Sequence, residues 1–171
     1  MSKNPVIECG DKYWYDEDGK LHRDDDLPAI ERANGIKEWH KHGKLHREMD
    51  LPATIGSDGK AHWWCLNGML HRNHDLPAVI NYSWGGLFSE EWYYNGQMYR
   101  QNDLPAYVES RGTKKWYMSD MLHRFDGKPA IEWAGGGKEW WVAGVRQMTK
   151  EEIDYELRLN YKIKIIEKRS A

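Results

Sequence analysis

The sequence predicts an elongated all-β protein, in which antiparallel β-hairpins of about 24 residues follow one another and an α-helix ends the chain. One phrase is repeated from end to end, and turn residues stand at fixed places within each copy. Such self-similarity is typical of repeat architectures, in which each unit packs mainly on its neighbours. The core of the phrase stands at Leu21-His22-Arg23, Leu45-His46-Arg47, Leu70-His71-Arg72 and Leu122-His123-Arg124, with the variant Met98-Tyr99-Arg100.

Two registers divide residues 4–147 into five full repeats with partial ends. Proline suits the first residue of a strand, because its missing N–H does least harm there. One proline opens each of six units, which we number from 1 to 6 in chain order: Pro5, Pro28, Pro52, Pro77, Pro105 and Pro129. An aromatic residue stands four positions before a turn in every unit, at Tyr15, Trp39, Trp64, Trp92, Trp116 and Trp140. The last unit loses the pattern after its turn, as terminal repeats do.

The turn residues predict how the strands pair. Asn-Gly turns favour two-residue hairpins because both central residues need a positive φ. A turn centred on Asn95-Gly96 places Tyr94 opposite Gln97 and Glu91 opposite Arg100, and a turn at His42-Gly43 likewise places Glu38 opposite Arg47. A second hairpin, turning at Asn34-Gly35, sets Ile30 opposite Trp39. Each unit then has three short strands. If about 17 strands at about 4.8 Å spacing were laid out singly, the sheet would approach 80 Å; the sequence leaves open whether the repeats lie as one open sheet or curl into a solenoid.

One insertion interrupts the repeat at residues 81–88. Trp84, Leu87 and Phe88 have no counterparts in the other units. We expect them to be exposed and to bind a partner, because exposed large apolar groups often mark an interface. The alternative is that Trp84 folds back and fills a gap over the sheet.

Residues 148–171 form a second segment, a predicted capping or docking helix. Thr149-Lys150-Glu151-Glu152 has the pattern of a helix capping box. The helix either covers the last sheet edge or docks onto a partner or a second copy through the apolar residues Ile153, Leu157, Tyr161 and Ile165.

Composition restricts the functional classes. The net charge of -2 gives no general attraction to nucleic acid. With two cysteines and no long apolar run, we expect a cytoplasmic protein without disulfides, signal peptide or membrane span.

The aromatic-x-x-Asn-Gly-x-Leu hairpins resemble MORN repeats and their bacterial variants. The Leu-His-Arg-x-x-Asp-Leu-Pro-Ala phrase departs from the standard, glycine-rich MORN unit. It is more similar to His-Arg-x-Asp-Gly-Pro-Ala repeats of tailed phages and large DNA viruses. The resemblance covers residues 4–147 and implies an elongated interaction or scaffold protein, here a virus-encoded binder of a host protein in the host cytoplasm.

The recurring His, Arg and Asp residues could suggest acid–base or metal chemistry. Tyr99 replaces the histidine in one unit without any other change in the pattern, which a catalytic or ligand position would not easily tolerate. The repeated residues are therefore interpreted as packing elements. We expect no catalytic residues, no metal site and no cofactor.

Two functional classes remain. In the first, a protein partner binds the Trp-rich face, because Trp and Arg often dominate binding energy. In the second, single-stranded nucleic acid or a glycan stacks along the Trp/His/Arg ladder; the acidic neighbours of the arginines disfavour it. The candidate anchors are Trp39, Trp64, Trp92, Trp116, Trp140, Arg47, Arg72, Arg100 and Arg124.

Overall fold

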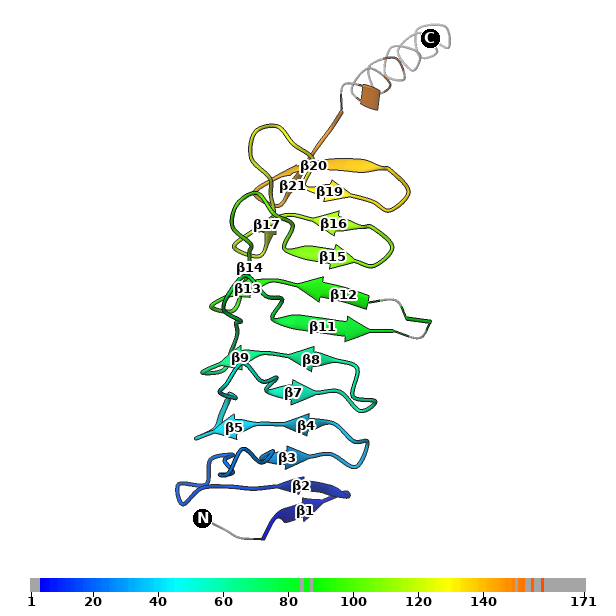
Figure 1. Ribbon diagram of the computed structural model, residues 1–171. Coiled ribbons are helices and arrows are strands. Elements are labelled where there is room, and N and C mark those ends of the chain that lie inside the picture. The colour runs from blue at the N-terminus through cyan, green and yellow to red at the C-terminus, as the bar shows by residue number, and fades with distance from the viewer. Residues whose placement is uncertain are drawn as a thin grey trace, which may run out of the picture.

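The computed structural model describes residues 4–83, 85–86, 88–149, 151–152, 155 and 158. It confirms the all-β prediction: every strand pairing in the described residues is antiparallel, and the chain rises as a ladder of short strands (Figure 1). A 13-stranded main sheet follows the chain order without crossovers, and four two-stranded hairpins stand beside it.

The main sheet contains β1 (Val6–Glu8), β2 (Asp11–Tyr13), β3 (Ile30–Glu31), β4 (Lys37–Glu38), β7 (Thr54–Ile55), β8 (His62–Trp63), β11 (Val79–Tyr82), β12 (Phe88–Glu91), β15 (Tyr107–Glu109), β16 (Lys114–Lys115), β19 (Ile131–Glu132), β20 (Lys138–Val142) and β21 (Val145–Gln147). The side hairpins pair β5 (His40–Lys41) with β6 (Lys44–Leu45), β9 (Cys65–Leu66) with β10 (Met69–Leu70), β13 (Tyr93–Tyr94) with β14 (Gln97–Met98), and β17 (Tyr117–Met118) with β18 (Met121–Leu122).

The strand that carries the register tryptophan changes partner at that residue. The Trp39 N–H donates to the Ala53 carbonyl of the next unit at 2.8 Å, and the Trp39 carbonyl accepts from the His46 N–H at 2.9 Å. The segment before Trp39 therefore belongs to the main sheet and the segment after it to a side hairpin. The prediction of three strands per unit in one sheet is wrong for this reason, and thirteen strands at about 4.8 Å span roughly 60 Å.

The predicted register of the side hairpins is confirmed. Tyr94 lies opposite Gln97, and Tyr93 opposite Met98. Asn95 and Gly96 have φ of 48° and 84°, the left-handed conformation that a two-residue hairpin of this kind requires.

The predicted register of the main-sheet hairpins is wrong by one residue. Ile30 lies opposite Glu38, not opposite Trp39. The connection is a three-residue loop rather than a two-residue one, because Arg32 N–H bonds to the Ile36 carbonyl at 2.9 Å. Since a one-residue slip moves each side chain to the other face, Trp39 is free to pack between units instead of beside Ile30.

In the first unit, the predicted position of the register aromatic residue is also wrong by one residue. Its register tryptophan is Trp14, which is buried and donates its N–H to the Ala29 carbonyl at 2.9 Å. Tyr15 instead forms an isolated bridge with Leu21. An extra residue in this hairpin, which closes through the Asp16 N–H and Lys20 carbonyl at 2.8 Å, explains the shift.

The buried core is a row of small clusters along the chain rather than one large hydrophobic centre. Each of five register tryptophans is 6–8% exposed, and the alanine after each of the last five prolines is 0% exposed. Each of units 2 to 5 thus contributes one buried indole and one buried alanine, and a larger side chain does not occur at the alanine position of units 2 to 6. These residues are Trp14, Trp39, Trp64, Trp92 and Trp116, with Ala29, Ala53, Ala78, Ala106 and Ala130.

The predicted capping box is present beyond the sheet. The Thr149 N–H donates to Glu152 Oε2 at 2.8 Å, and the Glu152 N–H donates to Thr149 Oγ1 at 3.2 Å. The structure describes only 155 and 158 of the residues that follow. Most of the predicted helix, including all four of its predicted docking residues, lies outside the described residues.

Candidate functional site

Each of units 2 to 5 holds the aspartate of the preceding unit with an arginine and a tryptophan. Arg47 Nη2 lies 2.7 Å from Asp26 Oδ2, and Arg47 Nε lies 2.8 Å from Asp26 Oδ1. The Trp39 indole N–H donates to the Asp26 backbone carbonyl at 3.0 Å. The Arg47 guanidinium also stacks over the Trp39 ring, 3.8 Å from its centroid, and donates to the Pro52 carbonyl at 3.2 Å. One arginine therefore contacts three consecutive units.

The same contact recurs along the chain, and it replaces the predicted pairing of Glu91 with Arg100 and of Glu38 with Arg47. Glu38 instead accepts hydrogen bonds from Arg32 and pairs with His40. The equivalent ion pairs are Arg72–Asp50, Arg100–Asp75 and Arg124–Asp103, at 2.8, 2.8 and 2.9 Å.

These ion pairs lower the pKa of the aspartates. The hydrogen bond from Arg47 holds the pKa of the Asp26 carboxyl below its usual range, and Arg72 and Arg100 do the same for Asp50 and Asp75. Arg124 and then Lys128 lower the pKa of Asp103 to about 2. Charge-assisted, bidentate contacts of this kind are stronger than single neutral hydrogen bonds.

The histidine of the repeated phrase accepts a backbone hydrogen bond from the next unit. The Asn67 N–H donates to His46 Nδ1 at 3.1 Å, and the Asn95 N–H donates to His71 Nδ1 at 3.2 Å. A ring nitrogen that accepts carries no proton, so the ring is held in its Nε2–H tautomer. Identical bonds join His42 to His22 and Ala143 to His123.

The unit with Tyr99 makes a different contact at the same junction. Asp120 occupies the second turn position of the next unit, where other units have glycine. Its carboxylate Oδ1 accepts the Met98 N–H at 2.7 Å. Replacement of histidine by tyrosine is therefore accompanied by a new acceptor one unit further on, which agrees with a packing role for the histidines.

The predicted partner-binding residues that the structure describes are buried or half-buried. Trp39, Trp64, Trp92 and Trp116 are buried within the chain, and the side chains of Arg47, Arg72, Arg100 and Arg124 are 13–16% exposed. Trp140 is half-buried, and Met148 stands at the position of the stacking arginine; no arginine among the described residues stacks on its ring. Phe88 is half-buried, with its ring centroid 6.0 Å from that of Tyr82. Trp84 and Leu87 lie outside the described residues.

An apolar surface that the sequence analysis missed runs along the side hairpins and the β20–β21 hairpin of unit 6. We call this surface the hairpin column. The residues just before and just after each turn are direct cross-strand pairs: Leu66 with Met69, Tyr94 with Gln97, Met118 with Met121, and Val142 with Val145. In unit 2 the same positions hold Lys41 and Lys44. A comparison of the residues on either side of each turn, unit by unit, would have revealed the hairpin column in the sequence.

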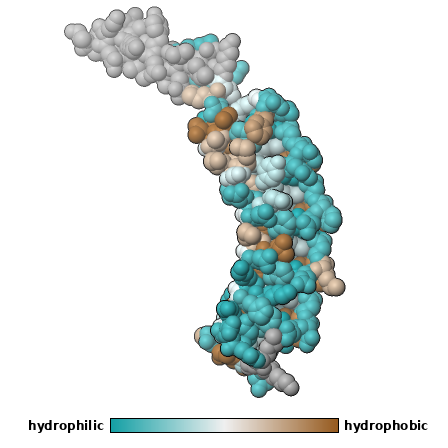
Figure 2. Space-filling model, turned by 90° about the vertical axis from the view of Figure 1, so that its left-hand side faces the viewer, coloured by the Kyte–Doolittle hydropathy of each residue, from teal (hydrophilic) through white to brown (hydrophobic). Residues whose placement is uncertain are grey.

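The column is continuous from unit to unit. The turn Gly68 N–H donates to the Leu45 carbonyl, and the Gly96 N–H donates to the Leu70 carbonyl at 2.9 Å. A Cβ placed on Gly96 would lie 3.5 Å from Met69 Cβ, so each turn rests on the side chain of the preceding hairpin. Figure 2 shows this side of the molecule, where apolar patches are set among hydrophilic residues.

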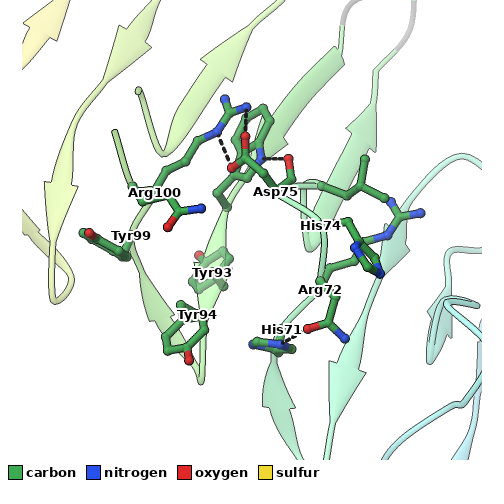
Figure 3. A pocket seen from close by; sticks show the side chains of 12 residues that line it. His71, Arg72, His74, Asp75, Tyr93, Tyr94, Tyr99 and Arg100 are labelled. Atoms are coloured by element: carbon green, nitrogen blue, oxygen red, sulfur yellow. Dashed lines mark hydrogen bonds and ion pairs between the residues drawn. The ribbon is translucent and has the colours of Figure 1, made fainter. Parts of the chain in front are cut away.

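Clefts lie between the phrase of one unit and the hairpin of the next. The cleft between units 3 and 4 has a volume of about 290 Å³, and Tyr93, Tyr94 and Tyr99 line it opposite His71 (Figure 3). The ring centroids of His71 and Tyr94 are 5.3 Å apart. The cleft between units 1 and 2 has the same volume, about 290 Å³, and equivalent lining residues. These clefts belong to the regular packing of units.

Groups capable of chemistry are few in the part of the chain that the structure describes. Burial raises the pKa of the Cys65 thiol to about 11, which keeps it in the unreactive thiol form. Burial first, and then Glu91, raise the pKa of Tyr93. No cluster of three or more His, Cys, Asp or Glu side chains among the described residues is arranged to hold a metal ion. None of the described helical residues belongs to a helix long and apolar enough to cross a membrane.

Comparison with protein families, with curated proteins and with solved structures finds no match to this chain.

Proposed function

We propose that this chain is a non-enzymatic scaffold that binds a protein partner along its hairpin column. The observation that carries the proposal is the exposed apolar series on that column. Val145 is 63% exposed, Tyr94 60% and Val142 49%, although these residues are paired across the strands beside their turns. Contiguous exposed apolar groups mark interaction sites, and Tyr and Met are enriched at protein interfaces.

The packing of the repeated residues supports a scaffold rather than an enzyme. The His, Arg, Asp and Trp side chains of the phrase are used for contacts between units, as at Arg47, Asp26 and Trp39. A catalytic site is normally a single arrangement of different residues, whereas these contacts recur in successive units with the same geometry.

The charges favour a protein partner over nucleic acid. A strand of nucleic acid would need the arginine ladder to contact its phosphates. Those guanidinium groups are already paired with aspartates and stacked on tryptophans, as Arg72 is on Asp50 and Trp64. Apart from Gln97, the exposed column in units 3 to 6 is apolar, which suits an apolar ridge on a protein.

The proposal includes the relationship to MORN-like repeat proteins of phages and large DNA viruses. It rests on the Leu-His-Arg and Asp-Leu-Pro-Ala motifs, and hairpins stacked in an antiparallel sheet agree with it. A cytoplasmic location follows from the same reading, with Cys9 and Cys65 as free thiols.

A pair of matched double variants tests the interaction surface. Tyr94→Ser with Val145→Ser removes two column residues, and Tyr82→Ser with Trp133→Ser removes two other exposed rings outside the column. The first variant should lose its partner in a pull-down from the host cytosol at an unchanged melting temperature, and the second should keep it. Retention of binding by the column variant, with folding intact, contradicts the proposal.

A further inference from the structure

The junction between units 5 and 6 keeps its tryptophan but has lost both members of the repeated ion pair. The Trp140 indole N–H donates to the Gly127 carbonyl at 3.0 Å, as the Trp39 indole does to the Asp26 carbonyl. Gly127 stands where the earlier units have the aspartate, and Met148 stands where they have the arginine. The Trp140 indole is therefore held as in the other units, while the carboxylate and the guanidinium are both replaced.

The ring of Trp140 lacks the cover that the other register tryptophans have. In units 1 to 5 an arginine guanidinium lies over that ring, 3.7–3.8 Å from the ring centroid. A cavity with a volume of about 430 Å³ adjoins Trp140, Gly127 and Met148, the three positions of the altered junction. It is larger than the clefts of about 290 Å³ at the junctions of units 1 with 2 and 3 with 4. The altered junction thus leaves an open site beside the indole.

The charged residues at this cavity leave one negative charge uncompensated. The two cations that line it are already paired with carboxylates. Lys128 Nζ lies 2.7 Å from Asp103 Oδ2. Arg124 binds Asp103 at 2.9 Å and Glu132 at 3.1 Å. Glu151 also lines the cavity, and its carboxylate has no hydrogen-bond or ion-pair partner among the described residues. A cationic group is therefore the complement of this site.

We propose that this cavity binds an arginine side chain of a partner protein, with the guanidinium stacked on Trp140. The chain itself shows in five units which group covers this indole. A planar, weakly hydrated guanidinium stacks on an aromatic face more readily than a strongly hydrated lysine ammonium. Met148 and Trp141 line the cavity and offer apolar contact to the methylene groups of the arginine. Glu151 supplies the opposite charge.

A single arginine should bind here weakly and reversibly. The internal arginines gain two further contacts, as Arg47 does from the Asp26 carboxylate and from the Pro52 carbonyl of the next unit. Gly127 offers no side-chain carboxylate, and the residues after Met148 do not continue the repeat. The site therefore adds to another contact with the same partner, through effective concentration, rather than holding that partner alone. Its binding of arginine does not depend on the hairpin column.

The indole N–H resonances of the isotopically labelled full chain test the proposal by NMR. N-acetyl-arginine amide is titrated at constant ionic strength, with N-acetyl-lysine amide and N-acetyl-norleucine amide as matched probes. The Trp140 resonance is assigned with Trp140→Phe. It should move saturably with the arginine probe, less with the lysine probe, and not with the norleucine probe. The Trp116 indole, which Arg124 already covers, is the internal control and should not move.

Single substitutions change the site in opposite directions. Met148→Arg supplies the guanidinium of the repeat, so it should shift the Trp140 resonance without any probe and abolish the response to the arginine probe; Met148→Leu should retain that response. Gly127→Asp restores the carboxylate of the other units at a backbone φ of 65°, close to the 53° of Asp103. It should strengthen binding of the arginine probe about fivefold, as one well-aligned surface ion pair does. Glu151→Gln should weaken binding about threefold.

Five results would each overturn the proposed site. They are an unmoved Trp140 resonance, an equal response to the norleucine probe, an undiminished response in Met148→Arg, no gain in Gly127→Asp, and unchanged binding in Glu151→Gln. An equal response to the norleucine probe would identify an apolar ligand instead. The remaining indole resonances report whether each variant is folded, and the wild-type titration with the three probes decides the matter where a variant is not.

Discussion

Arg47 and Asp26 are 21 positions apart in the sequence, yet their side chains meet in two hydrogen bonds of 2.8 and 2.7 Å. The pair joins two units, and the Trp39 ring under the guanidinium buries one face of the contact. Because Arg72, Arg100 and Arg124 repeat this geometry, the stability of the stack depends on contacts between units more than on any one unit.

Removal of one arginine should destabilise the fold. Arg72→Ala leaves Asp50 without its bidentate partner and uncovers Trp64. We expect a loss of about 2 kcal/mol in the free energy of unfolding, measured in urea. Arg111→Ala, at an exposed loop position, is the matched control and should change stability by less than about 0.5 kcal/mol. Equal effects of the two substitutions would contradict the role of the ion pair.

The aspartates should make stability depend on acid pH. Their folded-state pKa values lie below the ordinary value of about 4, and that of Asp103 is about 2. A lowered pKa stabilises the fold above the unfolded value, and this stabilisation is lost as pH falls through the folded value. The urea midpoint should therefore drop between about pH 4 and pH 2. Asp103→Asn should make the drop smaller; an unchanged pH profile would argue against the assignment.

A histidine of the phrase should contribute to stability and not to activity. His46→Phe leaves the Asn67 N–H without its acceptor, which should cost about 1–2 kcal/mol of unfolding free energy. His62→Phe is the control, because the His62 ring belongs to the main sheet and accepts no turn N–H among the described contacts. Partner binding by the His46 variant should remain intact, and a loss of binding without a loss of stability would point to a direct role.

The alanine of each junction should not accept a larger side chain. Ala78 is fully buried between units, and Ala78→Val adds two methyl groups at a close-packed position. We expect a loss of about 1–3 kcal/mol in thermal or urea unfolding. Ala33→Val, on an exposed loop, should be close to neutral. A stable Ala78 variant would mean that the junction has unfilled space.

The repeat, the strand directions and the side-hairpin register could be predicted because Asn95-Gly96 and similar turns determine them locally. The main-sheet register could not, because Ala33, Asn34 and Gly35 all belong to the loop and the dipeptide alone does not give loop length. The partner of Arg47 also escaped prediction. Counting residues outward from the turn placed Glu38 opposite Arg47, whereas the carboxylate that binds Arg47 is that of Asp26 in the preceding unit.

The candidate surface was predicted least well. Trp39 was singled out as an anchor because its spacing is regular, yet regular spacing in a repeat reflects burial between units. Tyr94 and Val145 escaped attention because their residue type changes from unit to unit while their position does not.

The pairing of each arginine with the aspartate of the unit before it has a consequence for how such an array can lengthen. A duplicated unit brings one cation and one anion together, and each finds its counterpart across the new junction. The pair itself therefore adds no net charge to the molecule, whatever the number of units. Elongation by duplication thus leaves none of these arginines or aspartates without a counterpart at the new junction, and this contact places no limit on the length of the array.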